Sequence, residues 1–314
     1  MKKSTDIIYS DEGLYFTPGN LFLDPVKPVV TAIISHAHAD HVAIGTRDIY
    51  CTPYTASLIR RRHRNYPGII YQKNFSEPFD VNGVTVTLIP AGHILGSAQI
   101  LLEKNNIRYL YTGDFKLCED ETCESFEFAE ADVLITESTF ALPETKHPDA
   151  IDEIKKLNNF NDVNFVIGCY ALGKAQRITK MINTHCPAKS VMVHKYMLAY
   201  HYFYEEAKRS LGKWEPYDKR KFKKEKNLVY LLPPAAYRSM YPNTSYIKAF
   251  ASGWDHLQET DFRLFISDHA DWNDLLILVE KVKPKEIFTL HGDGTHLANY
   301  FTGKNIAVHM LHIS

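Results

Sequence analysis

Residues 35–41 read Ser35-His36-Ala37-His38-Ala39-Asp40-His41 and follow the apolar run 29–34, Val-Val-Thr-Ala-Ile-Ile. Uncharged β-branched residues predict a buried strand for this run. A strand that ends in three histidines and an aspartate can direct these side chains from a rigid element at one point. Neutral imidazole and carboxylate are usual ligands of Zn²⁺ and similar divalent ions. We therefore predict that residues 35–41 belong to a metal site; the alternative is a polar surface loop that is rich in histidine.

Composition and charge are ordinary. The 314 residues can bury a sizeable core and exceed one average domain. The net charge of −1 argues neither for nor against a nucleic-acid partner, because a binding groove needs only local positive charge. No run approaches the roughly 20 apolar residues that span a bilayer, and the first residues lack the apolar core of a signal peptide. Five scattered cysteines are typical of thiols in a reducing compartment. We expect a cytoplasmic protein without a membrane partner.

Further apolar runs lead to chemically active side chains, in chain order His93, Asp114, Glu137, His269 and His291. Polar residues at the ends of many strands predict one edge of a sheet core where they all converge. Short strands that alternate with helices, such as the helix expected over 272–283, indicate an α/β layer architecture. Asp24 closes an early strand and is either a turn-forming residue or a hydrogen-bond acceptor that orients the histidine loop.

The character of the chain changes between about residues 173 and 249, where no ligand-type cluster occurs although ligands resume afterwards. The simplest interpretation is an inserted second domain that caps the first. We therefore predict a core formed by residues 1–172 and 250–314, interrupted by a cap over 173–249.

Seven candidate ligands are too many for one tetrahedral ion and suit two: His36, His38, Asp40, His41, His93, Asp114 and His291. Two ions about 3.5–4 Å apart need a bridging carboxylate, and Asp114 suits that role. A bridging hydroxide would then be the nucleophile, in an arrangement suited to in-line attack on phosphorus. His269 is left over from this ligand set and could protonate a leaving alkoxide, and Glu137 could hold that histidine oriented and cationic. The alternative for Glu137 is an ordinary strand-end carboxylate.

These motifs resemble the metallo-β-lactamase fold in its β-CASP nuclease branch. In chain order the resemblance covers Asp24, the loop His36-x-His38-x-Asp40-His41, and then the single residues His93, Asp114, Glu137, His269 and His291. It implies a four-layer αββα sandwich with an inserted compact β-CASP α/β cap. It also implies that one metal takes His36, His38, His93 and Asp114, and that the other takes Asp40, His41, Asp114 and His291. The metals would be two Zn²⁺, with Mn²⁺ as the alternative. Artemis/Snm-type enzymes generally lack a histidine at the last motif, so His291 favours a well-filled second site.

Softer matches resemble bacterial DNA ligase-associated exonucleases, among them the stretches 13–15, 91–99, 170–177 and 250–254. This resemblance implies a DNA exonuclease in repair, with an ATP-dependent DNA ligase and an Lhr-type helicase as partners. Three alternatives remain: an RNA-processing β-CASP ribonuclease, a non-catalytic nucleic-acid-binding paralogue, and hydrolysis of a small ester or lactam. The intact ligand set argues against the second. The inserted cap and the Glu137/His269 pair argue against the third.

Signals on the substrate side are weaker. Lys174 begins a predicted helix and either binds a phosphate or follows an ordinary helix cap. Ser252 and Trp254 could offer a turn to phosphate and an indole to a base, whereas the alternative for Trp254 is burial in a core. The lysine-rich run 219–226 is either a solvated loop or a source of salt-dependent affinity.

Overall fold

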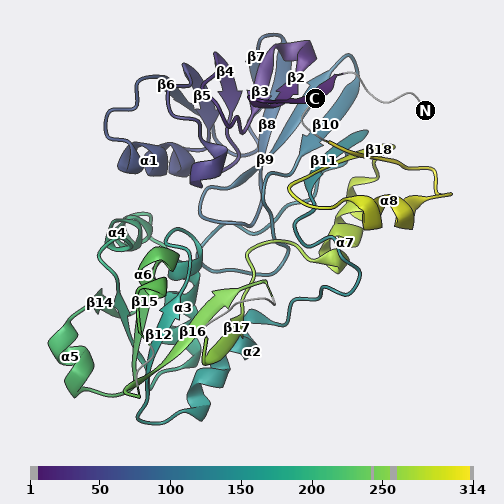
Figure 1. Ribbon diagram of the computed structural model, residues 1–314. Helices are drawn as coiled ribbons and strands as arrows, with labels where there is room; N and C mark the ends of the chain where they lie inside the picture. The colour runs from purple at the N-terminus through teal and green to yellow at the C-terminus, as the bar shows by residue number, and fades with distance from the viewer. Residues whose placement is uncertain (1–5, 242–243, 255–259, 312–314) are drawn as a thin grey trace. The chain divides into compact units, whose positions relative to one another are not determined.

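The computed structural model describes residues 6–241, 244–254 and 260–311. Compact packing divides the chain into two units. The first contains residues 1–119, 123–146 and 269–314, and the second contains 120–122 and 147–268. Figure 1 shows both units with their helices and strands.

The first unit holds two sheets. One has the order β1-β2-β3-β4-β5-β6, formed by Ile7–Ser10, Gly13–Phe16, Leu21–Leu23, Thr31–Ile33, Asp48–Cys51 and Ile69–Gln72. The other has the order β19-β18-β11-β10-β9-β8-β7. From β7 to β19 its strands are Phe79–Val81, Val84–Pro90, Ala98–Lys104, Ile107–Tyr111, Val133–Glu137, Glu286–Leu290 and Ala307–Met310.

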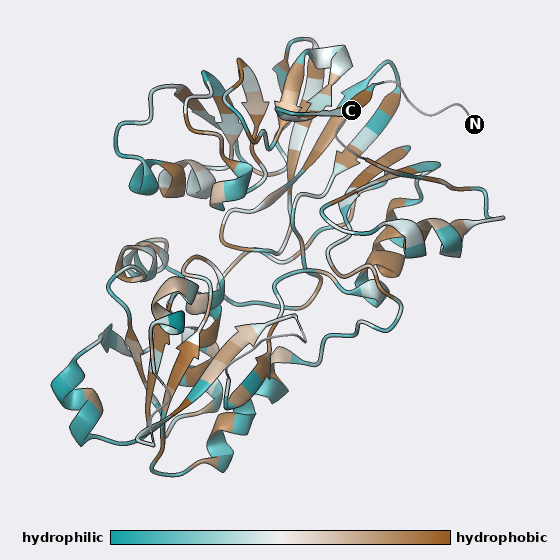
Figure 2. Cartoon of the chain, viewed as in Figure 1, coloured by the Kyte–Doolittle hydropathy of each residue, from teal (hydrophilic) through white to brown (hydrophobic). Residues whose placement is uncertain are grey.

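Alternating side chains explain why the second of these sheets is covered on both faces. In β10, Tyr109 and Tyr111 enter the core shared with the first sheet, whereas Leu110 points to the opposite face. There it packs with residues of α7 (Trp272–Val282) and α8 (Thr295–Phe301). Helix α1 (Pro53–Arg62) contacts β6 of the first sheet. Figure 2 shows hydrophobic stretches along the strands of this unit and on α7, which packs against them. The predicted αββα sandwich is therefore confirmed.

The second unit holds one six-stranded sheet of order β14-β13-β15-β12-β16-β17, in which every pairing is parallel. From β12 to β17 the strands are Asn164–Gly168, Ser190–Val193, Trp214–Pro216, Leu228–Leu232, Tyr246–Ser252 and Phe262–Phe265. Helices cover both faces: α2 (Ala150–Lys155) and α3 (Lys174–His185) lie against one, and α5 (Lys219–Lys224) and α6 (Pro234–Arg238) against the other. Helix α4 (Leu198–Glu206) contacts α3.

The second unit is wider than the interval 173–249 predicted from sequence. Strands β12, β16 and β17 lie partly or wholly outside that interval, yet they pair with one another and β12 pairs with β15 in the centre of the sheet. Composition could not reveal these pairings, because the same apolar runs would suit either unit. The second unit therefore contains residues 147–268 together with 120–122, and the predicted boundaries need this correction.

The strand directions of the first unit explain why its chemically active residues converge. Strands β10, β11 and β18 are parallel to one another, and β8 shares their direction because two antiparallel pairings separate it from β10. His93, Asp114 and His291 follow the carboxyl ends of β8, β10 and β18, and Glu137 is the last residue of β11. In the other sheet, β3 and β4 are parallel, so Asp24 lies beside the histidine loop.

Candidate metal centre

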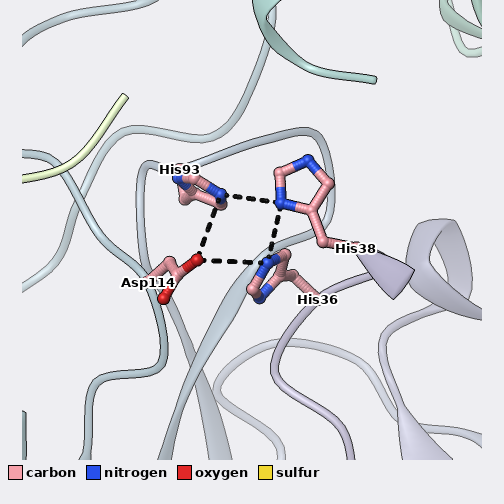
Figure 3. A group of neighbouring side chains, drawn as sticks. All are labelled: His36, His38, His93 and Asp114. Carbon is pink, nitrogen blue, oxygen red and sulfur yellow. Dashed lines mark hydrogen bonds and ion pairs between the residues drawn. The ribbon is translucent and has the colours of Figure 1, made fainter. Parts of the chain in front are cut away.

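Four side chains of the first unit converge on one point: His36, His38, His93 and Asp114. Figure 3 shows these ligand-type atoms facing one another. His38 Nδ1 lies 3.0 Å from His36 Nε2 and 3.1 Å from His93 Nε2. Asp114 Oδ2 lies 3.6 Å from His36 Nε2 and 3.7 Å from His93 Nε2. Four ligands about 2.1 Å from a tetrahedral Zn²⁺ are about 3.4 Å apart, so this spacing fits one ion.

Asp114 has the position that a bridging ligand needs. Its Oδ2 also lies 3.4 Å from His41 Nε2, so one oxygen faces three imidazoles. Gly113 makes this possible, because it has a φ of +55° and a Cβ there would lie 2.7 Å from Ser35 Cβ. The peptide before Asp114 can therefore approach the histidine loop closely.

The remaining predicted ligands are arranged more loosely. The Asp40 side chain is 82% exposed, and its Oδ2 lies 3.9 Å from His41 Nε2. His291 is exposed, has a φ of +54°, and its ring centroid is 5.7 Å from that of His41. Within the described residues, neither Asp40 nor His291 joins a group of three ligand atoms within 4.8 Å of one another. The four ligands predicted for the second metal thus lie in one region of the structure, but their ligand atoms do not converge as those of the first set do.

Asp24 orients the histidine loop. Its Oδ1 accepts the Ser35 N–H at 2.7 Å, and its Oδ2 accepts the Ser35 hydroxyl, His41 Nδ1–H at 2.9 Å and the Tyr111 hydroxyl at 3.0 Å. The bond to Nδ1 leaves His41 Nε2 directed at Asp114, and such outer contacts commonly orient metal-ligating histidines. Of the two interpretations of Asp24, the structure supports the hydrogen-bond acceptor. No local sequence signal could have revealed Tyr111, which lies 87 residues away along the chain.

Burial and neighbouring charges shift the pKa values of the site histidines in different directions. Burial lowers the pKa of His36 and of His93 well below the usual value, which favours the neutral imidazole that binds metals. Burial also disfavours charge on His41, but Asp114 and Asp24 together raise its pKa well above the usual value. Burial opposes ionisation of Asp114, yet His41 and His269 hold its pKa well below the usual value.

Glu137 and His269 form a pair beside the cluster. His269 Nδ1 lies 2.9 Å from Glu137 Oε2, and its ring centroid is 5.0 Å from that of His93. Glu137 is buried, and it also accepts the Phe115 N–H at 2.9 Å and the Thr139 hydroxyl at 2.7 Å. These contacts fix the carboxylate, which in turn fixes the ring of His269. The arrangement can present His269 Nε2 to a substrate as a proton donor.

The predicted substrate residues lie in the second unit and have different environments. Lys174 is buried, and its Nζ donates to Ile266 O at 2.7 Å and lies 3.6 Å from Asp268 Oδ2. The structure therefore corrects the phosphate-binding interpretation of Lys174, because its ammonium is occupied within the unit. Ser252 is also buried, and its hydroxyl accepts the Trp254 N–H at 3.1 Å. Trp254 is 52% exposed, so the core interpretation of this residue is wrong.

Comparisons with known proteins agree with this fold. Residues 6–194 match the β-lactamase superfamily domain, and residues 263–311 match the Zn-dependent metallo-hydrolase RNA specificity domain. The chain therefore belongs to the β-lactamase superfamily. Within it, the two matched domains and the relatives below place the chain in the metallo-β-lactamase/β-CASP nuclease family.

Three relatives illustrate the range of the family. A "Probable DNA ligase" of Opitutus terrae is 32% identical over 311 residues, which cover 93% of this chain and 30% of the relative. An "RNase J-like protein" of Methanocaldococcus jannaschii is 31% identical over 188 residues, 51% of this chain and 44% of the relative. A "DNA cross-link repair protein SNM1" of Arabidopsis thaliana is 29% identical over 156 residues, 45% of this chain and 32% of the relative. The chain thus spans less than half the length of each.

A solved structure supports the fold alone. A crystal structure of a protein of unknown function from Enterococcus faecalis V583 aligns with a TM-score of 0.63 and 15% identity, covering 90% of this chain and 79% of the other. Among the residues that the structure describes, no helix is both long and apolar enough to cross a bilayer.

Proposed function

We propose that this protein is a metal-dependent nuclease that hydrolyses phosphodiester bonds, and that it acts as a DNA exonuclease in repair. The observation that carries the proposal is the convergence of His36, His38, His93 and Asp114 beside the Glu137–His269 pair. A metal cluster alone would suit many hydrolases. His269 lies outside that cluster and is oriented by Glu137, so it adds a proton donor for an alkoxide leaving group.

The proposed metal content is two Zn²⁺, with Mn²⁺ as the alternative. His36, His38, His93 and Asp114 would hold one ion, and Asp40, His41, Asp114 and His291 the other. Such ions, when bound, supply positive charge for phosphoryl oxygens and lower the pKa of water. The exposure of Asp40 and His291 supports a second site that is weaker than the first.

The protein's own residues would act as follows. The reaction consumes one water, whose oxygen forms a new P–O bond and releases a proton to solvent, while the bond to the leaving oxygen breaks. His269 Nε2 gives its proton to that leaving oxygen. The Glu137 carboxylate accepts His269 Nδ1–H, so it keeps the ring oriented and stabilises its cationic form.

The proposal of DNA repair is supported by the relative named "Probable DNA ligase", whose match extends over nearly the whole of this chain. An ATP-dependent DNA ligase, with an Lhr-type helicase, would then be the functional partners. The second candidate function is RNA processing. It is favoured by the match to an RNA specificity domain and by a relative named "Endoribonuclease ysh1" from Aspergillus fumigatus.

One digestion experiment tests substrate, direction and metal together. Matched DNA and RNA strands labelled at either the 5′ or the 3′ end are incubated with purified protein loaded with Zn²⁺ or Mn²⁺. Stepwise loss of nucleotides from DNA, with RNA left intact, is expected. Faster cleavage of RNA would favour the second candidate, and no cleavage of either strand with either metal would refute the proposed chemistry.

Two variants separate metal binding from proton transfer. His38→Ala should lose bound metal and activity together. His269→Ala should keep its metal content while cleavage slows about 10²- to 10⁴-fold, the usual contribution of a general acid. His185→Ala is the matched control, because this histidine lies in the last turn of α3 in the other unit. Loss of metal from His269→Ala would show that His269 is a ligand instead.

A further inference from the structure

Three large aromatic side chains of the second unit are exposed just beyond the ends of its strands. Tyr170 is 56% exposed, Tyr196 66% and Trp254 52%. Tyr170 follows the end of β12 by two residues, Tyr196 follows β13 by three, and Trp254 follows β16 by two. A single exposed aromatic residue needs no explanation, but three at equivalent places in one sheet do.

The topology of the sheet brings these three positions to the same edge. All its strands are parallel, so their carboxyl ends lie together. The relevant strands are ordered β13-β15-β12-β16, and neighbouring strands are about 4.8 Å apart. The row therefore extends over about 14 Å, which suits several successive bases. In open parallel sheets, ligands bind beyond the carboxyl ends of the strands.

The backbone beside each ring is held by hydrogen bonds. The Trp254 N–H donates to Ser252 Oγ at 3.1 Å, and the Tyr196 N–H donates to His194 Nδ1 at 3.3 Å. The Tyr170 carbonyl accepts the Ala175 N–H at 3.1 Å, in the first turn of α3. Such positions lose less conformational freedom when a ligand binds.

Charge indicates which partner these rings suit. Residues 120–122 and 147–268 contain 19 Lys and Arg against 15 Asp and Glu, whereas the rest of the chain contains 17 against 22. The positive charge of a nearly neutral chain is thus concentrated in the unit that carries the rings. The exposed Lys195 adds a cation whose Nζ is 5.2 Å from the centroid of Tyr196. Aromatic rings together with cations are how proteins bind single strands without reading sequence.

We propose that Tyr170, Tyr196 and Trp254 form a stacking platform for the bases of a single-stranded nucleic acid. The platform would hold the strand that the proposed nuclease degrades, so the inference rests on the proposed function. It concerns binding rather than the reaction, which allows the two to be tested apart.

The test measures binding without cleavage. The protein, in excess chelator, is titrated with a fluorescent single strand of about ten nucleotides, a length within the range of known sites. A duplex of equal length is titrated in parallel. Tyr196→Ala and Trp254→Ala should each weaken single-strand binding about 5- to 100-fold. Tyr196→Phe should restore it, because phenylalanine also stacks. Tyr241→Ala is the matched control. Tyr241 is 85% exposed in the same unit, but it precedes β16 and so lies before the amino end of that strand, and its carbonyl accepts the Tyr246 hydroxyl.

Each outcome decides for or against the platform. Selective loss of single-strand affinity in the alanine variants, with thermal unfolding unchanged, supports it. Wild-type affinity in both variants overturns it, as does an equal loss in Tyr241→Ala or a wild type that binds only duplex. A wild type that binds single strands through these rings but cleaves no phosphodiester when metal-loaded would refute the proposed function and leave the platform standing.

Discussion

The change Asp24→Asn tests whether the histidine loop is positioned by a single buried carboxylate. Asp24 has a φ of +46°, a conformation that asparagine tolerates, so the backbone can stay in place. Its two oxygens accept four hydrogen bonds, one at Oδ1 and three at Oδ2. An amide has one oxygen and one NH₂ group. The best orientation places the amide oxygen where Oδ2 accepts three hydrogen bonds. The NH₂ group then takes the place of Oδ1 and faces the N–H of Ser35, which is also a donor.

The magnitude follows from that mismatch. A buried donor left without an acceptor costs about 1–3 kcal/mol, so the free energy of unfolding should fall by that amount. Because the same carboxylate orients His41, affinity for metal should fall about 10- to 100-fold, as for other outer contacts of metal ligands.

The assay is competition for Zn²⁺ with a fluorescent chelator, together with thermal unfolding with and without metal. The matched control is Asp162→Asn in the second unit, where the aspartate also has a positive φ, of 57°. Wild-type metal affinity in Asp24→Asn, or an equal loss in the control, would refute the reasoning.

Three further outcomes are expected. Gly92→Ala should destabilise the protein by about 2 kcal/mol or more, because φ is +72° and the new Cβ would lie 2.5 Å from Lys116 O. Denaturant unfolding measures this, and Gly303→Ala should cost less because nothing lies within 4 Å of its Cβ. Burial lowers the pKa of His201 to about 4, so the folded chain resists a proton that the unfolded chain takes up near pH 6.5. The free energy of unfolding should therefore fall by up to about 3 kcal/mol between pH 6.5 and 4. It should fall less in His201→Gln, and equal pH profiles of the free energy of unfolding in that variant and the wild type would contradict this. Chelation should lower the melting temperature, since a ligand at 100 times its Kd stabilises by about 2.7 kcal/mol, and an unchanged melting temperature would count against a resident metal.

The sequence alone was sufficient for the elements and residue types of the site. The helix predicted over 272–283 is confirmed, because apolar periodicity encodes it locally. The candidate ligands could be named because few side chains bind divalent ions and these side chains follow apolar strands. His36, His38, His93 and Asp114 indeed meet in the folded chain.

Tertiary structure alone decided the contacts that depend on residues far apart in sequence. Asp24 and Tyr111 meet because two different sheets place them at one edge, and no local pattern records that meeting. The limits of the inserted unit depend on which strands β12 and β16 pair with. The burial of Lys174 and the exposure of Trp254 depend on what packs over each residue, whereas sequence specifies only what each side chain is able to do. Residue chemistry is thus a local property of the chain, but the distance between two such residues is set by the packing of its sheets.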